Sequence, residues 1–204
     1  MSKFKSLFGP LALAVAAVFM NPSPAEAARV LLLTDSESHE ITALEGALRT
    51  AGHTVTKAGP EFSYPIGPSL SNSFDVVVHM NGQTFDQSMS SATQQALVEF
   101  VRGGGGFIGA QWLGFEESGT GAQVNMPDLV LMGGTMEAMI DGCENCALTV
   151  VTGQAEHPVL RGIPASSRID GGFWDGTPKS FSANPPPVLM RLNGINAVLA
   201  RQVD

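Results

Sequence analysis

Apolar runs alternate with amphipathic segments over residues 29–112. Residues 30–34 form a continuous apolar run with the length and composition of a strand that is buried on both faces. Residues 74–80 predict a second buried strand, and residues 107–110 predict a third strand. A shorter run at residues 53–57 predicts a further strand. Between these runs, apolar side chains recur with the spacing of one helical face. They are Ile41, Leu44, Ala47 and Leu48 in the first segment and Ala96, Leu97, Phe100 and Val101 in the second.

Short links separate these segments. Gly52 is a natural end for the first helix, and the four glycines at residues 103–106 end the second and lead directly into a strand. Ser90 or Ser91 can cap the second helix. Because strand, helix and strand follow one another closely, the crossovers are right-handed. The sequence therefore predicts an α/β fold with a doubly wound, mostly parallel sheet and helices on both faces.

The pattern is less regular elsewhere. Residues 60–72 are rich in proline and serine and predict a surface loop inside the domain. In the second half, residues 147–152 and 187–192 have the composition of strands, and residues 196–202 predict one more. No internal repeat divides the chain. We therefore expect one folded domain over residues 28–204.

The first 27 residues have the pattern of a secretory signal peptide. Lys3 and Lys5 precede ten apolar residues, 11–20, and Ala25-Glu26-Ala27 fits the small-x-small rule of signal peptidase. The apolar run is too short for a membrane anchor, since spanning the hydrocarbon core takes about 20 apolar residues. We expect cleavage after Ala27, a periplasmic or secreted location, and no membrane attachment after cleavage.

Charge and glycine placement exclude two classes of ligand. The chain has 11 Lys and Arg against 19 Asp and Glu, a net charge of −8, and its basic residues are nowhere clustered. Since nucleic-acid binding needs a basic face, we expect no nucleic-acid partner. The glycines at residues 103–106 precede a strand instead of opening a helix, so they do not form a phosphate-binding loop. No cofactor is predicted.

Polar and aromatic residues follow three of the predicted strands. Doubly wound sheets bind ligands beyond the carboxyl ends of their strands, where these residues would lie. Asp35 and Asn81 also suit ordinary turns, and Trp112 and Trp174 suit either stacking on a sugar ring or core packing. The candidate ligand-binding residues are Asp35, Ser36, Asn81, Gly82, Gln111, Trp112 and Trp174.

The four histidines differ in their expected roles. His39 follows the first strand and suits a general base, a metal ligand, a sugar contact, or a helix-start histidine bonded to nearby backbone. His79 lies within a predicted buried strand and is expected in the core, and His53 is expected at the surface. His157, next to a proline, is expected to shape a loop.

The two cysteines form the motif Cys143-Glu-Asn-Cys146. In an exported chain this spacing favours a structural disulfide that closes a small loop. A redox role would need the strand-then-helix context of thioredoxin-like proteins, which is missing, and zinc would need two further ligands. A metal site elsewhere would need Asp35, His39, His157 and Asp170 to converge, which no spacing demands, so no metal ligand is assigned.

Three stretches of sequence together resemble the ThuA-like (trehalose-utilisation) family of the class I glutamine amidotransferase-like superfamily. They read VLLLTDSESHEITALEGAL, FDVVVHMNG followed by QQALVEFVRGGGGFIGAQW, and HPVLRGIP. The resemblance covers nearly all of residues 29–174. It implies a flavodoxin-like sheet and a carbohydrate substrate, and it matches His39 to the loop histidine of the family.

The chain departs from this family at its reactive positions. The superfamily's nucleophilic cysteine belongs at the turn Ala110-Gln111-Trp112, where this chain has neither cysteine nor serine, so glutamine amidotransfer is rejected. Many ThuA-like proteins have histidine at this turn, a Gly-His-Pro near residues 133–140, and a glutamate after the residue that matches Asp170. This chain has none of the three. It also ends at Asp204, where the family usually continues, which predicts a short member or a fragment.

Two functions are compatible with this sequence. The first is an exported ThuA-like domain that binds or acts on a carbohydrate, such as an oxidised sugar, with His39 as proton carrier and Asp170 as its partner. The second is a non-catalytic domain with a degenerate active site that binds a sugar or a partner protein. Whether the chain is an enzyme stays open at this point.

Overall fold

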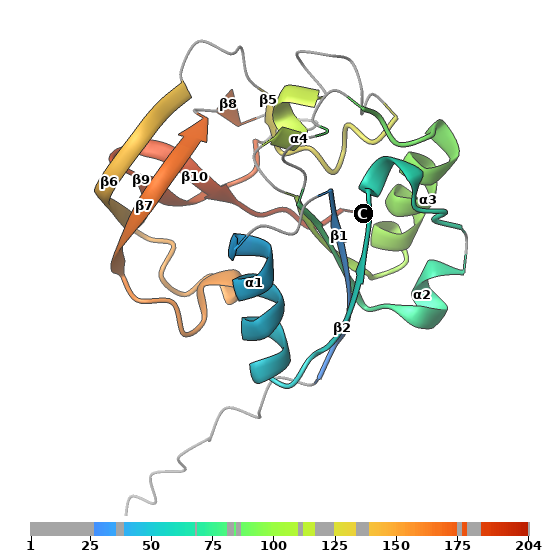
Figure 1. Ribbon diagram of the computed structural model, residues 1–204. Helices are drawn as coiled ribbons and strands as arrows, with labels where there is room; N and C mark the ends of the chain where they lie inside the picture. Colours follow the sequence, from blue (N-terminus) through green and yellow to red (C-terminus); the bar gives the residue numbers. More distant parts are fainter. Residues whose placement is uncertain are drawn as a thin grey trace, which may run out of the picture.

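The computed structural model describes residues 27–35, 39–67, 69–80, 84, 87–109, 112–116, 125–133, 139–174, 177–178 and 185–203. The predicted signal peptide lies outside them, apart from Ala27. The described strands form a four-stranded parallel sheet, a four-stranded antiparallel sheet and a two-stranded ladder (Figure 1). The ladder joins β5 (Met132–Gly133) to β8 (Thr177–Pro178).

The parallel sheet has the strand order β2-β1-β3-β4. Its strands are β1 (Arg29–Thr34), β2 (Thr54–Ala58), β3 (Val76–Met80) and β4 (Gly106–Gly109), which confirms the four strands predicted in this half. All neighbouring pairs run parallel. The α/β class is thereby confirmed, whereas the flavodoxin-like topology as a whole stays a prediction.

Helices cover both faces of this sheet, because the four residues between the first and the last of β1 are all apolar and buried. Leu31 and Leu33 face a core that includes Leu97 of α3 (Ser91–Arg102), and Val30 and Leu32 face the side of α1 (His39–Thr50). Figure 1 shows α1 on one side of the sheet and α2 and α3 on the other. Truncating a fully buried leucine such as Leu31 to alanine typically costs about 2–5 kcal/mol.

The predicted helix boundaries are confirmed by their hydrogen bonds. Gly52, at φ +95°, ends α1 in the left-handed conformation that glycine favours, and the His53 N–H donates to the Leu48 carbonyl (3.1 Å). Ser90 caps α3, since its Oγ accepts the Thr93 N–H at 3.1 Å. Of the two serines considered for this cap, the first is therefore used.

The prediction of a surface loop over residues 60–72 is wrong in part. This stretch holds the short 3-10 helix η1 (Glu61–Ser63) and the beginning of α2 (Leu70–Ser73). Ile66 and Leu70 are buried in the core on the α3 side of the sheet. Ile66 and Leu70 hold this segment onto the core together with the partly buried Tyr64, and the prolines and serines around them obscured this role in the sequence pattern.

The second half forms an antiparallel sheet of order β10-β9-β6-β7. Its strands are β6 (Met139–Val150), β7 (Ser166–Trp174), β9 (Val188–Leu192) and β10 (Ile195–Leu199). The three strands expected in this half exist, but the prediction of one mostly parallel sheet is wrong for it. Asn193 and Gly194 join β9 to β10 with φ +47° and +90°, and a two-residue turn of this kind connects only antiparallel strands.

The end of the chain returns to the first core. After β10, Val203 packs against the cluster that contains α3 and β1, and Figure 1 places the C-terminal end beside the parallel sheet. The Asp128 carboxylate forms ion pairs with Arg102 Nη2 at 3.1 Å and with Arg201 Nη1 at 3.8 Å. These ion pairs link the end of α3 to the residues that follow β10. In the described part of the chain, no helix has the length and apolar character needed to cross a bilayer.

Candidate functional site

The carboxyl ends of the parallel strands meet at one edge of the sheet. The register pairs Thr34 of β1 with Met80 of β3, and His79 of β3 with Gly109 of β4. The residues that follow each strand therefore share this edge, which is where open α/β sheets bind ligands. Asp35 is the residue directly after β1.

The side chain of Asp35 is fixed to the segment that follows β3. Its Oδ2 accepts two hydrogen bonds from Thr84, one from the backbone N–H at 2.6 Å and one from Oγ1 at 2.8 Å. Residue 84 lies 49 positions further along the chain. A partly buried carboxylate is thus held between the ends of two neighbouring strands.

His79 places a buried imidazole near this carboxylate. Its side chain is 0% exposed, and its ring centroid lies 6.4 Å from that of Phe107. Neither ring nitrogen has a hydrogen-bond partner among the described residues. Burial lowers the pKa of His79 to about 4, although the negative charge of Asp35 opposes the shift. The imidazole is therefore neutral at pH 7. The prediction of a core position for His79 is confirmed, whereas no pattern in the sequence indicated that this residue lies near Asp35.

A third segment closes against the same edge. Gly59 follows β2, and a Cβ atom at this position would overlap the carbonyl oxygen of Thr34. The chain between β2 and η1 can therefore lie against the end of β1 only with glycine here. Asp35, Thr84 and Gly59 together define the candidate site from three separate segments.

Most of the other residues predicted for this site are placed only in part. Trp112 begins α4 (Trp112–Phe115), His39 begins α1, and Trp174 ends β7, with side chains outside the described residues. The backbone of His39 thus follows the carboxyl end of β1, as expected. The predicted residues that lie outside the described parts of the chain altogether are Ser36, Asn81, Gly82 and Gln111.

Asp170 lies on the exposed strand β7 and contacts the cysteine motif. Its Oδ1 accepts the backbone N–H of Asn145, while Arg168 Nη1 donates to the Asn145 carbonyl at 2.8 Å. Asn145 has φ +54°, and the β6–β7 register shifts between Cys143 and Cys146. These contacts stabilise a bulge in the second sheet. The proposed partnership of Asp170 with His39 stays a prediction.

Cys146 is buried in a small apolar cluster with Leu192 and is also contacted by the polar side chain of Asn193. Asn193 Nδ2 lies 3.0 Å from its Sγ, and Asn193 Oδ1 accepts the Ala147 N–H at 3.0 Å. The side chain of Cys143 is outside the described residues, so the expected disulfide stays a prediction. No group of three metal-ligating side chains occurs within the described ranges.

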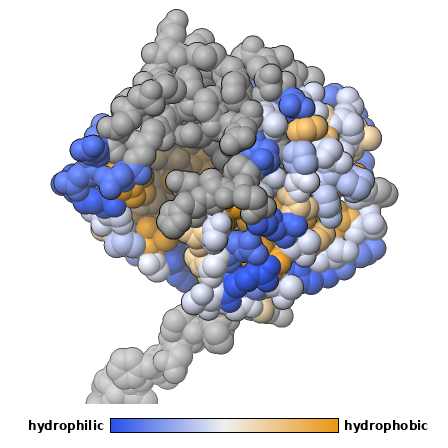
Figure 2. Space-filling view, viewed as in Figure 1, coloured by the Kyte–Doolittle hydropathy of each residue, from blue (hydrophilic) through white to orange (hydrophobic). Residues whose placement is uncertain are grey.

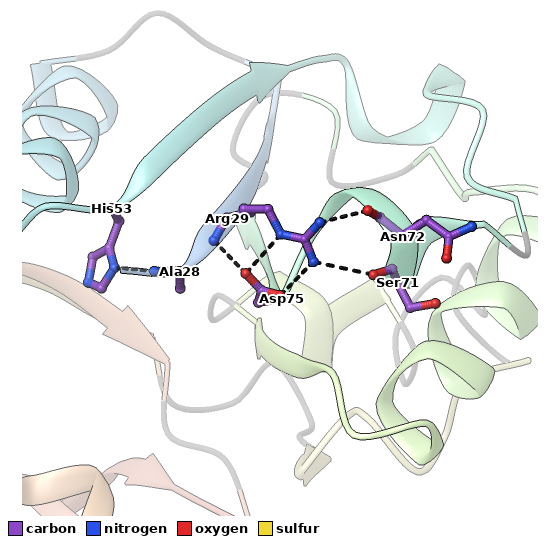
Figure 3. A network of polar contacts seen from close by, with 6 residues as sticks. All are labelled: Ala28, Arg29, His53, Ser71, Asn72 and Asp75. Atoms are coloured by element: carbon purple, nitrogen blue, oxygen red, sulfur yellow. Dashed lines mark hydrogen bonds and ion pairs between the residues drawn. The ribbon is translucent and has the colours of Figure 1, made fainter. Parts of the chain in front are cut away.

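A polar network lies at the opposite, amino-terminal end of β1 (Figure 3). Arg29 binds Asp75 through its backbone N–H at 2.7 Å and through Nη2 at 2.7 Å, and its Nη1 donates to the Asn72 carbonyl at 2.6 Å. This pairing lowers the pKa of Asp75 to about 2. Next to it, the Ala28 N–H donates to His53 Nδ1 at 3.1 Å, so the imidazole expected at the surface is half-buried. The network holds the amino-terminal end of β1 in place. It therefore lies at the opposite end of this strand from the candidate site.

The remaining histidine has the loop-shaping role expected of it. His157 precedes the 3-10 helix η4 (Pro158–Leu160), and its Nδ1 accepts the Val159 N–H at 3.3 Å. A side chain that accepts a hydrogen bond two residues ahead stabilises a turn. His157 is therefore explained by local structure.

Two solved structures resemble this fold. The first is described as a putative ThuA-like protein from Bacteroides uniformis ATCC 8492. It has 19% sequence identity and a TM-score of 0.57, and the match covers 82% of this chain and 69% of that one. The second, SMU.1228c, has 14% identity and a TM-score of 0.46, with 81% and 68% covered. No family model and no curated protein matches the sequence. The chain shares its fold with the first of these structures, which confirms the ThuA-like resemblance of its sequence at the level of the fold.

Proposed function

We propose that this chain is an exported ThuA-like domain that binds, or acts on, a carbohydrate at the carboxyl edge of its parallel sheet. The observation that carries the proposal is the Asp35 carboxylate, held at this edge by two hydrogen bonds from Thr84 and accompanied by the neutral imidazole of His79. Carboxylate oxygens accept hydrogen bonds from sugar hydroxyls, and a neutral imidazole both donates and accepts them.

The site does not support glutamine amidotransfer. The sequence that follows β4 reads Ala110-Gln111-Trp112, and none of these side chains can attack a carbonyl. His39 remains the proposed proton carrier, because its backbone follows β1 at the same edge as Asp35. Sugar isomerisation or hydrolysis would use such a group within hydrogen-bond reach of the substrate.

A thermal-shift screen of residues 28–204 tests the proposal. The probes are mono- and disaccharides, their keto forms and divalent metals. A ligand at about one hundred times its dissociation constant stabilises a domain by about 2.7 kcal/mol, which raises Tm by several degrees. We expect a sugar to raise Tm, and we expect Asp35→Asn to remove that shift.

The matched control is Glu99→Gln, which removes one negative charge from the exposed surface of α3. This variant should keep the full sugar response. If no sugar raises Tm, or if both variants respond like the original chain, carbohydrate binding at Asp35 is wrong. His39→Ala then separates the two forms of the proposal, because loss of turnover with binding retained identifies an enzyme.

A second candidate is a non-catalytic domain that binds a partner protein. It is favoured by large apolar side chains that remain exposed, with Ile108 of β4 at 57% and Val159 at 55%. Figure 2 shows hydrophobic residues lying among hydrophilic ones on the face it presents. A blank sugar and metal screen, together with His39→Ala behaving like the original chain in every assay, would support this candidate.

A further inference from the structure

We propose that His79 is a binding residue of the candidate site and that its imidazole takes up one hydroxyl group of the ligand beside Asp35. This inference rests on the carbohydrate function proposed above and deepens it. Nothing in the sequence pattern marks His79 for this role, since the residue lies inside an apolar strand.

The position of His79 in the sheet brings it to the strand-end edge. It is the last residue but one of β3 and pairs with Leu33 of β1 and Gly109 of β4. Side chains alternate along a strand, so His79 projects to the same face as Val77, which belongs to the core on the α3 side. Its direct partner Leu33 lies two residues before Asp35, and positions two apart along a strand project to the same face, so the register brings Asp35 and His79 to the same corner of the sheet.

The packing of the sheet gives no reason for a histidine at this position. The imidazole is fully buried next to Phe107, and within the described part of the chain its two nitrogens are without hydrogen-bond partners. A buried polar group in this state destabilises a fold, and an apolar ring of similar size would avoid that loss. The imidazole is therefore better explained by a group that enters the site than by the folded chain alone.

The chemistry of the two side chains selects a hydroxyl group. A neutral imidazole offers one N–H donor and one nitrogen acceptor, and the Asp35 carboxylate offers only acceptors. A hydroxyl can donate to one of these groups while it accepts from the other. An anion would be repelled by Asp35 and by the net charge of −8, and the described residues supply no third ligand for a metal ion.

The first test compares His79→Phe with the original chain, using glucose, its monodeoxy analogues and trehalose as probes. We expect His79→Phe to raise Tm without sugar, because two unpaired buried nitrogens are removed, and to weaken sugar binding at least tenfold. One monodeoxyglucose, the one that lacks the hydroxyl bound by His79, should bind the original chain about as weakly as glucose binds His79→Phe. The affinity of His79→Phe for that analogue should be little lower still, since the substitution and the missing hydroxyl remove the same hydrogen bond.

The matched control is Phe107→Leu, which alters the ring that His79 contacts but leaves the polar groups intact. It should lower Tm and keep the discrimination among deoxyglucoses. If the original chain binds sugar and His79→Phe binds it equally well, the role of His79 is wrong while the proposed function stands. If the original chain binds none of these sugars, both are overturned.

A second measurement keeps the test valid if His79→Phe fails to fold. The nitrogen resonances of the His79 imidazole are followed by NMR in the original chain during a sugar titration. A shift that saturates together with binding supports the hydrogen bond. Resonances that stay unchanged while Asp35→Asn abolishes binding contradict it.

Discussion

At the scale of single residues, the ionisation of His79 links the candidate site to stability. The imidazole is buried in an apolar environment, and its folded-state pKa of about 4 lies below the ordinary value of 6.5. Between these two values the unfolded chain binds a proton that the folded chain excludes. The free energy of unfolding must therefore rise with pH across this window.

We predict that the free energy of unfolding falls as the pH falls from 6.5 towards 4. Above pH 6.5 the His79 imidazole should add no further stability. A shift of this size corresponds to a loss of about 3 kcal/mol at the acid end, taken as an order of magnitude. Urea unfolding at a series of pH values measures it. His79→Phe should flatten the curve in this window, and an unchanged slope in that variant would assign the dependence to other groups.

At the scale of elements, the helix that follows the candidate site depends on a local cap. Ser90 satisfies an N–H at the beginning of α3, whose buried face includes Leu97 and Phe100. The side chain of Gln94 also binds two neighbouring segments. Its Nε2 donates to the Met89 carbonyl at 2.8 Å, and its Oε1 accepts the Asn125 N–H at 2.9 Å. The position of α3 on the sheet is thus fixed at its first turn.

We predict that Ser90→Ala destabilises the chain by about 1 kcal/mol, because one N–H of the first turn loses its partner. Ser90→Asp should retain most of the stability, since aspartate also accepts this hydrogen bond. Chemical unfolding of both variants measures the difference. Equal losses for alanine and aspartate would show that the hydroxyl of Ser90 acts through something other than capping.

The first half of the fold was predictable from sequence because periodicity and turn residues agree there. Buried strands, amphipathic helices and the stop at Gly52 each follow from local rules. The second half was predicted less well, because its strands alternate weakly. Asn193-Gly194 between two apolar runs was the available signal for an antiparallel hairpin. At the site, Asp35 was predictable as a strand-end residue, whereas Thr84 meets it only through the folded chain.

At the scale of the whole molecule, the end of the chain connects its two sheets. β10 belongs to the antiparallel sheet, while Val203, four residues beyond it, packs into the core of the parallel one. Arg201 and Arg102 both contact Asp128 along this path. The two halves are therefore held together by both apolar and charged contacts.

We predict that deleting residues 201–204 lowers the free energy of unfolding by about 1 kcal/mol or more, because the partly buried Val203 leaves the core. Deleting residue 204 alone is the control and should have a small effect. Thermal unfolding monitors both. A two-step transition in the longer deletion would further show that the sheets unfold separately, whereas no loss of stability would contradict the role of Val203.

Processing of the exported chain is a further prediction at this scale. We expect the mature protein to begin at Ala28 and to be two hydrogens lighter than its reduced form because of a Cys143–Cys146 disulfide. N-terminal sequencing and mass measurement before and after reduction test both statements. An intact Met1 contradicts export cleavage, and free thiols in fresh protein contradict the disulfide.

The close approach of Gly59 to the Thr34 carbonyl has a consequence for mutational scanning. In a library of all single substitutions selected for ligand binding, every change at position 59 should be depleted, as strongly as changes at a residue that binds the ligand. Because Gly59 contacts Thr34, the residue directly before Asp35, such a map would place position 59 in the proposed binding site. Selecting the same library for folded protein would correct this assignment, since variants at Gly59 would be lost there too, and variants at Asp35 would survive.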